Sequence, residues 1–209
     1  MINFTDREKY PIFTKTYCFA VSNYSTDINY YHTIHHIYNM LKLASKDEEY
    51  IRSIIDVDCF ITAILFHDVV YVTGRQENET DSAKMFEKVY DTCFKNDEIY
   101  SESKKNLICN LILSTKYGYK HITQSEKLLH DYDYIGFADK YDMLLADKQI
   151  LNECLRDRFS FAISISGRLD FYKTLYDNIC QSGQLFLTDK YSKFNEAALN
   201  NIKEHIGLN

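Results

Sequence analysis

The residues with the clearest chemical meaning are a His-Asp pair inside an apolar run. The segment FITAILFHDVVYVTG, residues 60–74, carries His67 and Asp68 in its middle. Burying an unpaired carboxylate is costly, and adjacent residues of a helix do not face one another. The pair must therefore converge on another group. That group is either protein, such as backbone, arginine or tyrosine, or a bound ligand.

A cluster of histidines precedes this segment. Three of the seven histidines lie within five residues, in YYHTIHHIYNML: His32, His35 and His36. His32 and His36 are four residues apart and would share one face of a helix. Neutral imidazole together with carboxylate is a metal-ligand set. A later segment, LLHDYDYIGFADKYDML, offers further carboxylates that could complete such a set: Asp131, Asp133 and Asp139.

Helical periodicity runs through nearly the whole chain, which predicts an all-α fold. We expect Thr26 or Asp27 to cap a helix through about Leu43, and Asp47 to cap a second helix to about Val70. No segment alternates apolar and polar residues with turns at hairpin spacing. Further helices are predicted at about 80–90, at 97–115, in three or four pieces between 125 and 180 broken near Gly136 and Gly167, and at 189–206.

Length and composition predict one domain. The 209 residues contain no internal repeat and no linker rich in glycine, proline or serine. We therefore expect a single domain over residues 1–209, with a motif-bearing core at about 28–180 and a last helix at about 189–206. One proline and six glycines leave few helix breakers, while 18 tyrosines and 13 phenylalanines favour aromatic packing.

Charge and cysteine content limit the partners. A net charge of −6 excludes an extended basic surface for nucleic acid. No apolar run is long enough to span a membrane, so no membrane partner is expected; a homo-oligomer stays compatible with the sequence. The six cysteines are scattered without a CxxC pair, which is typical of free thiols in a reducing compartment. Because the N-terminus also lacks a signal-peptide pattern, we expect a cytoplasmic protein.

The order of these residues resembles the HD superfamily of metal-dependent phosphohydrolases. In that family a His, a His-Asp dipeptide on a later helix and a distant Asp lie on a helical bundle. The closer likeness is to a bacterial subfamily of predicted HD-type phosphohydrolases with the segments YHNLxHI, WFHDxVY, DNExxSA, TKxH, DxDL and a late Gly-Arg pair. The matching segments cover about residues 28–205: YHTIHHI at 31–37, LFHDVVY at 65–71, ENETDSA at 77–83, TKYGYKH at 115–121, DYDY at 131–134 and SGRLDFY at 166–172.

The resemblance implies four metal ligands: His36, His67, Asp68 and Asp133. Two departures from the family pattern matter. Tyr134 stands where the family has an aliphatic residue, and FADKYDML resembles the ADRL segment of more distant HD proteins, so Asp139 remains an alternative to Asp133. The longer spacer in TKYGYKH leaves the role of His121 open.

These ligands predict a divalent cation and hydrolytic chemistry. Two imidazoles and two carboxylates suit Mn²⁺, Fe²⁺, Co²⁺, Ni²⁺ or Mg²⁺, and Zn²⁺ is also compatible. The resemblance then implies an enzyme that hydrolyses a phosphate ester or anhydride of a small molecule, by analogy a nucleotide, with a metal-activated water. Two alternatives are a non-catalytic HD-type module that binds a nucleotide and regulates a partner, and a helical protein whose His-Asp cluster is a structural network.

Further residues receive roles beside the ligands. Asp68 is expected to orient or deprotonate the attacking water, and Glu79 to orient the water or bind a second metal ion. The expected substrate contacts are Lys116, His32 and Arg75. Each has a structural alternative, such as a lysine at a helix end, a core histidine, a loop charge or a carboxylate at a helix N-terminus. Arg168 is expected to form a structural ion pair.

Overall fold

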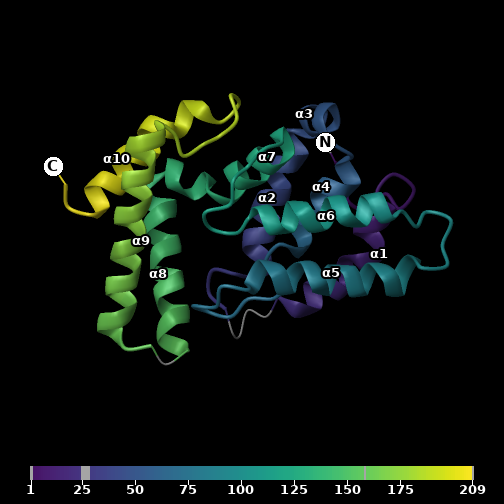
Figure 1. The fold of residues 1–209 in the computed structure, drawn as a ribbon, viewed down its shortest axis with the longest axis horizontal. Coiled ribbons are helices and arrows are strands. Elements are labelled where there is room, and N and C mark those ends of the chain that lie inside the picture. Colours follow the sequence, from purple (N-terminus) through teal and green to yellow (C-terminus); the bar gives the residue numbers. More distant parts are fainter. Residues whose placement is uncertain (1, 25–28, 158, 209) are drawn as a thin grey trace. The chain divides into compact units, whose positions relative to one another are not determined.

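The computed structural model describes residues 2–24, 29–157 and 159–208. Within these ranges every regular element is helical: there are ten α-helices, two short 3-10 helices and no strand (Figure 1). The prediction of an all-α fold is therefore confirmed. Among the described residues, no helix has the length and apolar character needed to cross a membrane.

Contacts between residues divide the chain into two compact units, Met1–Leu129 and His130–Asn209. Helix α7, Gln124–Asp133, contains the boundary, since the first unit ends and the second begins within it. The organisation of residues 1–209 as one domain stays a prediction.

Helix α4, Val57–Phe66, forms the centre of the first unit. Its sequence, VDCFITAILF, is almost entirely apolar, and all ten residues are buried. A helix that is apolar on every side must be surrounded by other elements. The helices that contact α4 are α1 (Pro11–Asn23), α2 (Ile34–Lys46), α3 (Glu48–Ile54), α5 (Asn78–Phe94) and α6 (Glu102–Ser114).

The first predicted helix begins later than the sequence indicates. Helix α2 starts at Ile34, where the Thr33 side chain accepts a hydrogen bond from the His35 N–H at 3.3 Å. An N-cap threonine satisfies one of the first N–H groups of a helix, so the start is fixed there. Thr26 and Asp27, which the sequence offers as caps, lie outside the described residues.

The helix predicted from Asp47 to Val70 is two helices, α3 and α4. The chain breaks because Asp56 caps a new helix, its carboxylate accepting a hydrogen bond from the Cys59 N–H at 3.3 Å. Helix α4 also ends earlier than predicted, at Phe66. The apolar spacing continues across both boundaries, so periodicity alone did not reveal them.

Asp58 connects α4 to the first turn of α1. Its buried carboxylate accepts hydrogen bonds from the backbone N–H groups of Ile12 at 2.8 Å and Phe13 at 2.9 Å. These are among the first N–H groups of α1, which have no partner within their own helix. Pro11, at the start of α1, has no N–H to satisfy. Asp58 therefore caps α1 from a helix that is distant in sequence.

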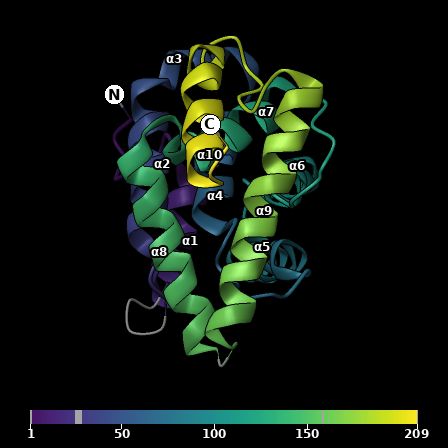
Figure 2. The same cartoon turned by 90° about the vertical axis from the view of Figure 1, so that its left-hand side faces the viewer.

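The second unit is built on a helical hairpin. Helices α8 (Lys140–Arg156) and α9 (Phe161–Ser182) lie side by side, and the chain joins them at one end (Figure 2). Helix α10 (Asn195–His205) packs against both and against the 3-10 helix η1 (Ile135–Ala138). A second 3-10 helix, η2 (Ser192–Phe194), directly precedes α10.

The break predicted at Gly167 is absent, because α9 continues through this residue. Glycine inside a helix costs only about 1 kcal/mol relative to alanine, and the next residue contributes a contact that holds the hairpin. Arg168 Nε pairs with Asp147 Oδ1 of α8 at 2.6 Å, as expected for a structural ion pair. The interruption near Gly136 is present, since this residue lies in η1.

Two other helices begin later than predicted. Helix α6 starts at Glu102 instead of residue 97, because the Ser101 side chain caps it by accepting a hydrogen bond from the Lys104 N–H. Helix α10 starts at Asn195 instead of residue 189. The Asn195 side chain accepts hydrogen bonds from the N–H groups at residues 185 and 186, which holds the preceding segment outside the helix.

Asp58 should make stability depend on pH. Burial raises the pKa of its carboxyl to about 6, above the value of about 3.9 for an unfolded aspartate. Between these values the folded chain binds more protons at this position, so its contribution to stability falls as the pH rises from about 4 to 6. In urea titrations we compare the free energy of unfolding of the wild type with that of Asp58→Asn at each pH. We expect the wild-type value to fall by about 1–3 kcal/mol relative to the variant between about pH 4 and pH 6.

The control is Asp142→Asn, which removes a charge from an exposed position on α8. Its free energy of unfolding should follow that of the wild type at each pH. A constant difference between wild type and Asp58→Asn from pH 4 to 6 would contradict the assignment.

Candidate metal centre

His36, His67 and Asp68 come together at one end of α4, within the first unit. His36 lies in the first turn of α2, which packs against α4. His67 and Asp68 follow the last residue of α4 in a turn. The exposed fractions of the three side chains are 8%, 1% and 14%, respectively, so the cluster is largely shielded from water.

The three donor atoms have the spacing of ligands around one cation. His67 Nε2 lies 3.1 Å from Asp68 Oδ2 and 3.3 Å from His36 Nε2, and His36 Nε2 lies 4.0 Å from Asp68 Oδ2. A point inside this triangle is about 2.1 Å from all three atoms, a typical distance from imidazole nitrogen or carboxylate oxygen to a divalent cation. The residues present therefore fit such an ion.

The direct contact between His67 and Asp68 differs from the sequence expectation. Neighbours in a continuous helix point apart, and the sequence predicted a helix through both residues. Since α4 ends at Phe66, the pair lies in a turn, where the two side chains converge.

The orientation of the His67 ring is set by the backbone of its own helix. His67 Nδ1 lies 2.9 Å from the Ile64 carbonyl oxygen. A carbonyl accepts only a donated hydrogen, so Nδ1 carries the proton, and in the neutral ring Nε2 presents its lone pair. Metal-ligating histidines show this arrangement, with one nitrogen donating to the protein and the other facing the ion.

Asp68 is held as a carboxylate. Burial by itself would raise the pKa of its carboxyl, but positive charge and a hydrogen bond at His67, followed by charge at His32 and His36, hold that pKa well below its usual range. The side chain is therefore ionised at neutral pH, as a carboxylate ligand of a cation must be.

Two side chains from the first turns of α5 hold the segment after Asp68. The Asn78 amide donates to the Val72 carbonyl and accepts from the Val72 N–H, both at 3.0 Å. The Ser82 hydroxyl bonds to the N–H and carbonyl of Val70 at 3.1 and 3.2 Å. Both residues lie in the segment ENETDSA, which supports the family resemblance but does not by itself reveal these contacts.

His32 lies ahead of α2 and not on it, so the expectation that His32 and His36 share a helix face is wrong. His32 nevertheless lies close enough to the cluster to help lower the pKa of Asp68. Its ring stacks on Tyr71, with centroids 3.4 Å apart, and Tyr31 packs on the His36 ring with centroids 4.9 Å apart. Aromatic rings thus surround the imidazoles on this side.

The remaining predicted residues have varied surroundings. Arg75 lies exposed in the loop before α5, and its guanidinium pairs with Asp81 at 2.5 Å. Glu79 is half-buried in the first turn of α5. Lys116 is exposed in the turn that follows α6, while His121 Nε2 lies 2.9 Å from the Ser114 carbonyl oxygen. Roles of these residues toward a substrate stay predictions.

The three aspartates considered as a further ligand lie in the second unit. Asp131 is buried and accepts hydrogen bonds from the N–H groups of Leu187 at 2.6 Å and Thr188 at 2.9 Å. Asp139 is exposed and caps α8, accepting from two N–H groups of its first turn at 2.8 and 3.1 Å. Asp133 is the last residue of α7 and is half-buried.

Comparison with protein-family models, with curated proteins and with solved structures finds no match to this chain. The resemblance to the HD superfamily therefore rests on the quoted motifs and their order.

Cation binding should stabilise the folded chain. A ligand that binds only the folded state at 100 times its dissociation constant adds about 2.7 kcal/mol to the free energy of unfolding. We expect Mn²⁺ or Co²⁺ to give a gain of this size in the wild type, and His36→Ala to abolish it because one ligand is lost. Urea titrations with and without the cation measure the difference.

His35→Ala is the matched control. His35 is the exposed neighbour of His36 in the same helical turn, so this variant should keep the full gain. An equal gain in His36→Ala and wild type would show that the cation binds elsewhere.

Proposed function

We propose that this chain is a metal-dependent phosphohydrolase of the HD type. The observation that carries the proposal is the convergence of His36, His67 and Asp68 around a point about 2.1 Å from each donor atom. The ordered motifs from about residue 28 to 205 support the family. The proposed substrate is a phosphate ester or anhydride of a small molecule, and by analogy with the family a nucleotide.

The proposed cofactor is a divalent cation. Imidazole nitrogen and carboxylate oxygen without thiolate suit Mn²⁺, Fe²⁺, Co²⁺, Ni²⁺ or Mg²⁺, and Zn²⁺ is compatible. When bound, such a cation lowers the pKa of a water molecule and polarises a phosphoryl group.

Asp133 is the proposed fourth ligand, in preference to Asp139. Its place in the DYDY segment, which matches the DxD segment of the family, supports the choice. The carboxylate of Asp139 instead accepts hydrogen bonds from the first turn of α8, as the carboxylate of a helix N-cap does.

The chain's own residues have separate tasks in this proposal. Asp68, held as a carboxylate, orients the attacking water and takes its proton, and Glu79 assists it from the first turn of α5. Positive and donor groups stabilise the charge that develops on a transferring phosphoryl group. Lys116, Arg75 and His32 are the proposed contacts to the phosphate.

The proposal includes a cytoplasmic location. All six cysteines lie within the described residues, and all are free thiols, as is usual in a reducing compartment. The proposed partner is the small phosphorylated substrate, and self-association stays a prediction.

Phosphate release from a panel of phosphomonoesters, nucleoside triphosphates and cyclic phosphodiesters, with Mn²⁺, Co²⁺ or Mg²⁺, tests the activity. We expect turnover of at least one substrate. Asp68→Asn and Asp133→Asn should each lower kcat/KM by about 10³-fold, equivalent to about 4 kcal/mol of transition-state stabilisation. Asp139→Asn should keep the wild-type value, because asparagine also caps a helix.

The panel also separates the alternatives. Tight nucleotide binding without turnover would support the regulatory module instead. A chain that binds no metal and releases no phosphate, and in which His67→Ala only lowers stability, would support a structural network. Loss of activity in Asp139→Asn but not in Asp133→Asn would reverse the choice of fourth ligand.

Lys116 should affect substrate binding more than the chemical step. A hydrogen bond to a charged group contributes about 1.5–3 kcal/mol, so Lys116→Gln should raise KM about 10- to 100-fold with little change in kcat. Steady-state kinetics with the best substrate of the panel measure both constants. Lys120→Gln, at an exposed lysine of the same loop, is the control and should leave KM unchanged.

A further inference from the structure

A buried tyrosine at the end of α1 reaches the last turn of α4. Tyr24 directly follows α1, and only 7% of its surface is exposed. Its hydroxyl donates a hydrogen bond to the Leu65 carbonyl at 2.9 Å. The helices α1 and α4 pack against each other, so the contact is part of the core of the first unit.

The Leu65 carbonyl needs this partner. The last four carbonyls of a helix have no N–H of the same helix to accept from. The Val69 N–H, which would reach Leu65 if α4 continued, donates to the next carbonyl at 3.2 Å instead. The carbonyl before it, at Ile64, accepts from the His67 ring. Two side-chain donors, Tyr24 and His67, therefore close the end of α4.

The same hydroxyl also lies close to Asp68. Burial first, and the negative charge of Asp68 second, raise the pKa of Tyr24 well above its usual value, while a hydrogen bond from the Asp68 backbone N–H acts in the opposite direction. Because a carbonyl only accepts, the Tyr24 hydroxyl is the donor in its contact with Leu65. One hydroxyl thus connects the last turn of α4 with the backbone of a proposed ligand.

We propose that Tyr24 is a positioning residue, whose hydroxyl holds the end of α4 so that the side chains of His67 and Asp68 converge. This role rests on the proposed function, because it concerns the same metal centre. Tyr24 holds the backbone that precedes the pair, and Asn78 and Ser82 hold the backbone that follows it. The ligand-bearing turn is therefore fixed from both sides.

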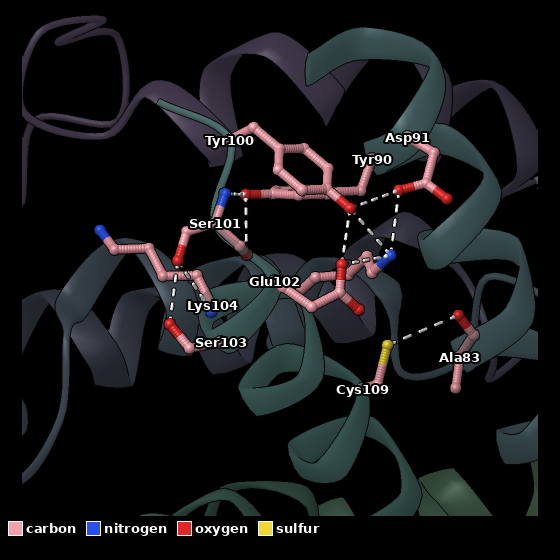
Figure 3. Close-up of polar contacts among 10 residues, drawn as sticks. Ala83, Tyr90, Asp91, Tyr100, Ser101, Glu102, Ser103, Lys104 and Cys109 are labelled. Carbon is pink, nitrogen blue, oxygen red and sulfur yellow. Dashed lines mark hydrogen bonds and ion pairs between the residues drawn. The ribbon is translucent and has the colours of Figure 1, made fainter. Parts of the chain in front are cut away.

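The chain offers a matched control at another place in the first unit. The Tyr90 hydroxyl donates to the Ser101 carbonyl at 3.3 Å and accepts from the Ser101 N–H at 3.0 Å (Figure 3). Tyr90 is fully buried. Like Tyr24, it uses one hydroxyl to hold a turn of backbone, here between α5 and α6. Phenylalanine at either position removes the hydroxyl and keeps the ring.

Cobalt titration of the full-length variants tests the role. Changing residues that orient metal ligands typically costs about 10- to 100-fold in metal affinity. We expect Tyr24→Phe to raise the Co²⁺ dissociation constant by this factor and to change the visible absorption spectrum of bound Co²⁺. Tyr90→Phe should lower the melting temperature and leave both the dissociation constant and the spectrum as in the wild type.

The outcomes separate this inference from the proposed function. A wild type that binds no Co²⁺ overturns the proposed function and the role of Tyr24 together. A wild type that binds Co²⁺ and a Tyr24→Phe variant with the same affinity and spectrum overturn the positioning role alone. Equal weakening in Tyr24→Phe and Tyr90→Phe also overturns it, since the effect would then follow general stability.

A second measurement keeps the hydroxyl and avoids dependence on the folding of Tyr24→Phe. 3-Fluorotyrosine is incorporated at position 24 or, as a control, at position 90, and the fluorine resonance is recorded as paramagnetic Co²⁺ is added. The resonance at position 24 should shift or broaden, and the one at position 90 should change far less. An unchanged resonance at position 24, with Co²⁺ bound, would remove Tyr24 from the centre.

Discussion

The first unit depends on how one wholly buried helix ends. Around α4 there is little water to hydrate the carbonyls of its last turn, and an unpaired buried polar group costs free energy comparable to a lost hydrogen bond. The His67 ring and the Tyr24 hydroxyl satisfy two of these carbonyls. Because one nitrogen of His67 is engaged in this way, the other faces His36 and Asp68. The ligand-like geometry is thus a consequence of closing the helix.

The surrounding helices maintain the same arrangement through side-chain contacts to backbone. Asp58 holds the start of α1 against α4, which places the end of α1, and therefore Tyr24, beside the last turn of α4. Asn78 and Ser82 hold the backbone segment that follows Asp68. These contacts join segments that are distant in sequence, so the cluster is a product of the tertiary fold and not of any single helix.

Much of this could be predicted from the sequence, and the missing parts have physical reasons. Periodicity gave the all-α fold, and the interruption of an apolar run identified His67 and Asp68. The predicted helix ends were wrong where polar capping residues such as Thr33 and Asp56 start a helix inside a continuing apolar pattern. Gly167 did not end a helix, because tertiary contacts outweigh one unfavourable residue. A contact such as that of Tyr24 leaves no local pattern at all.

The close contact between His67 and Asp68 also places a requirement on charge in the cluster. If the His67 ring is neutral, its Nε2 lone pair and the Asp68 carboxylate are both acceptors, yet they lie 3.1 Å apart. Protein atoms cannot bring two acceptors this close without repulsion unless positive charge lies between or beside them. Protons on the imidazoles supply that charge in one form of the chain, and a divalent cation would supply it in another. In the proposed metal centre, protons and the cation would compete for the same donor atoms, and the buried helix end fixes the positions of those atoms.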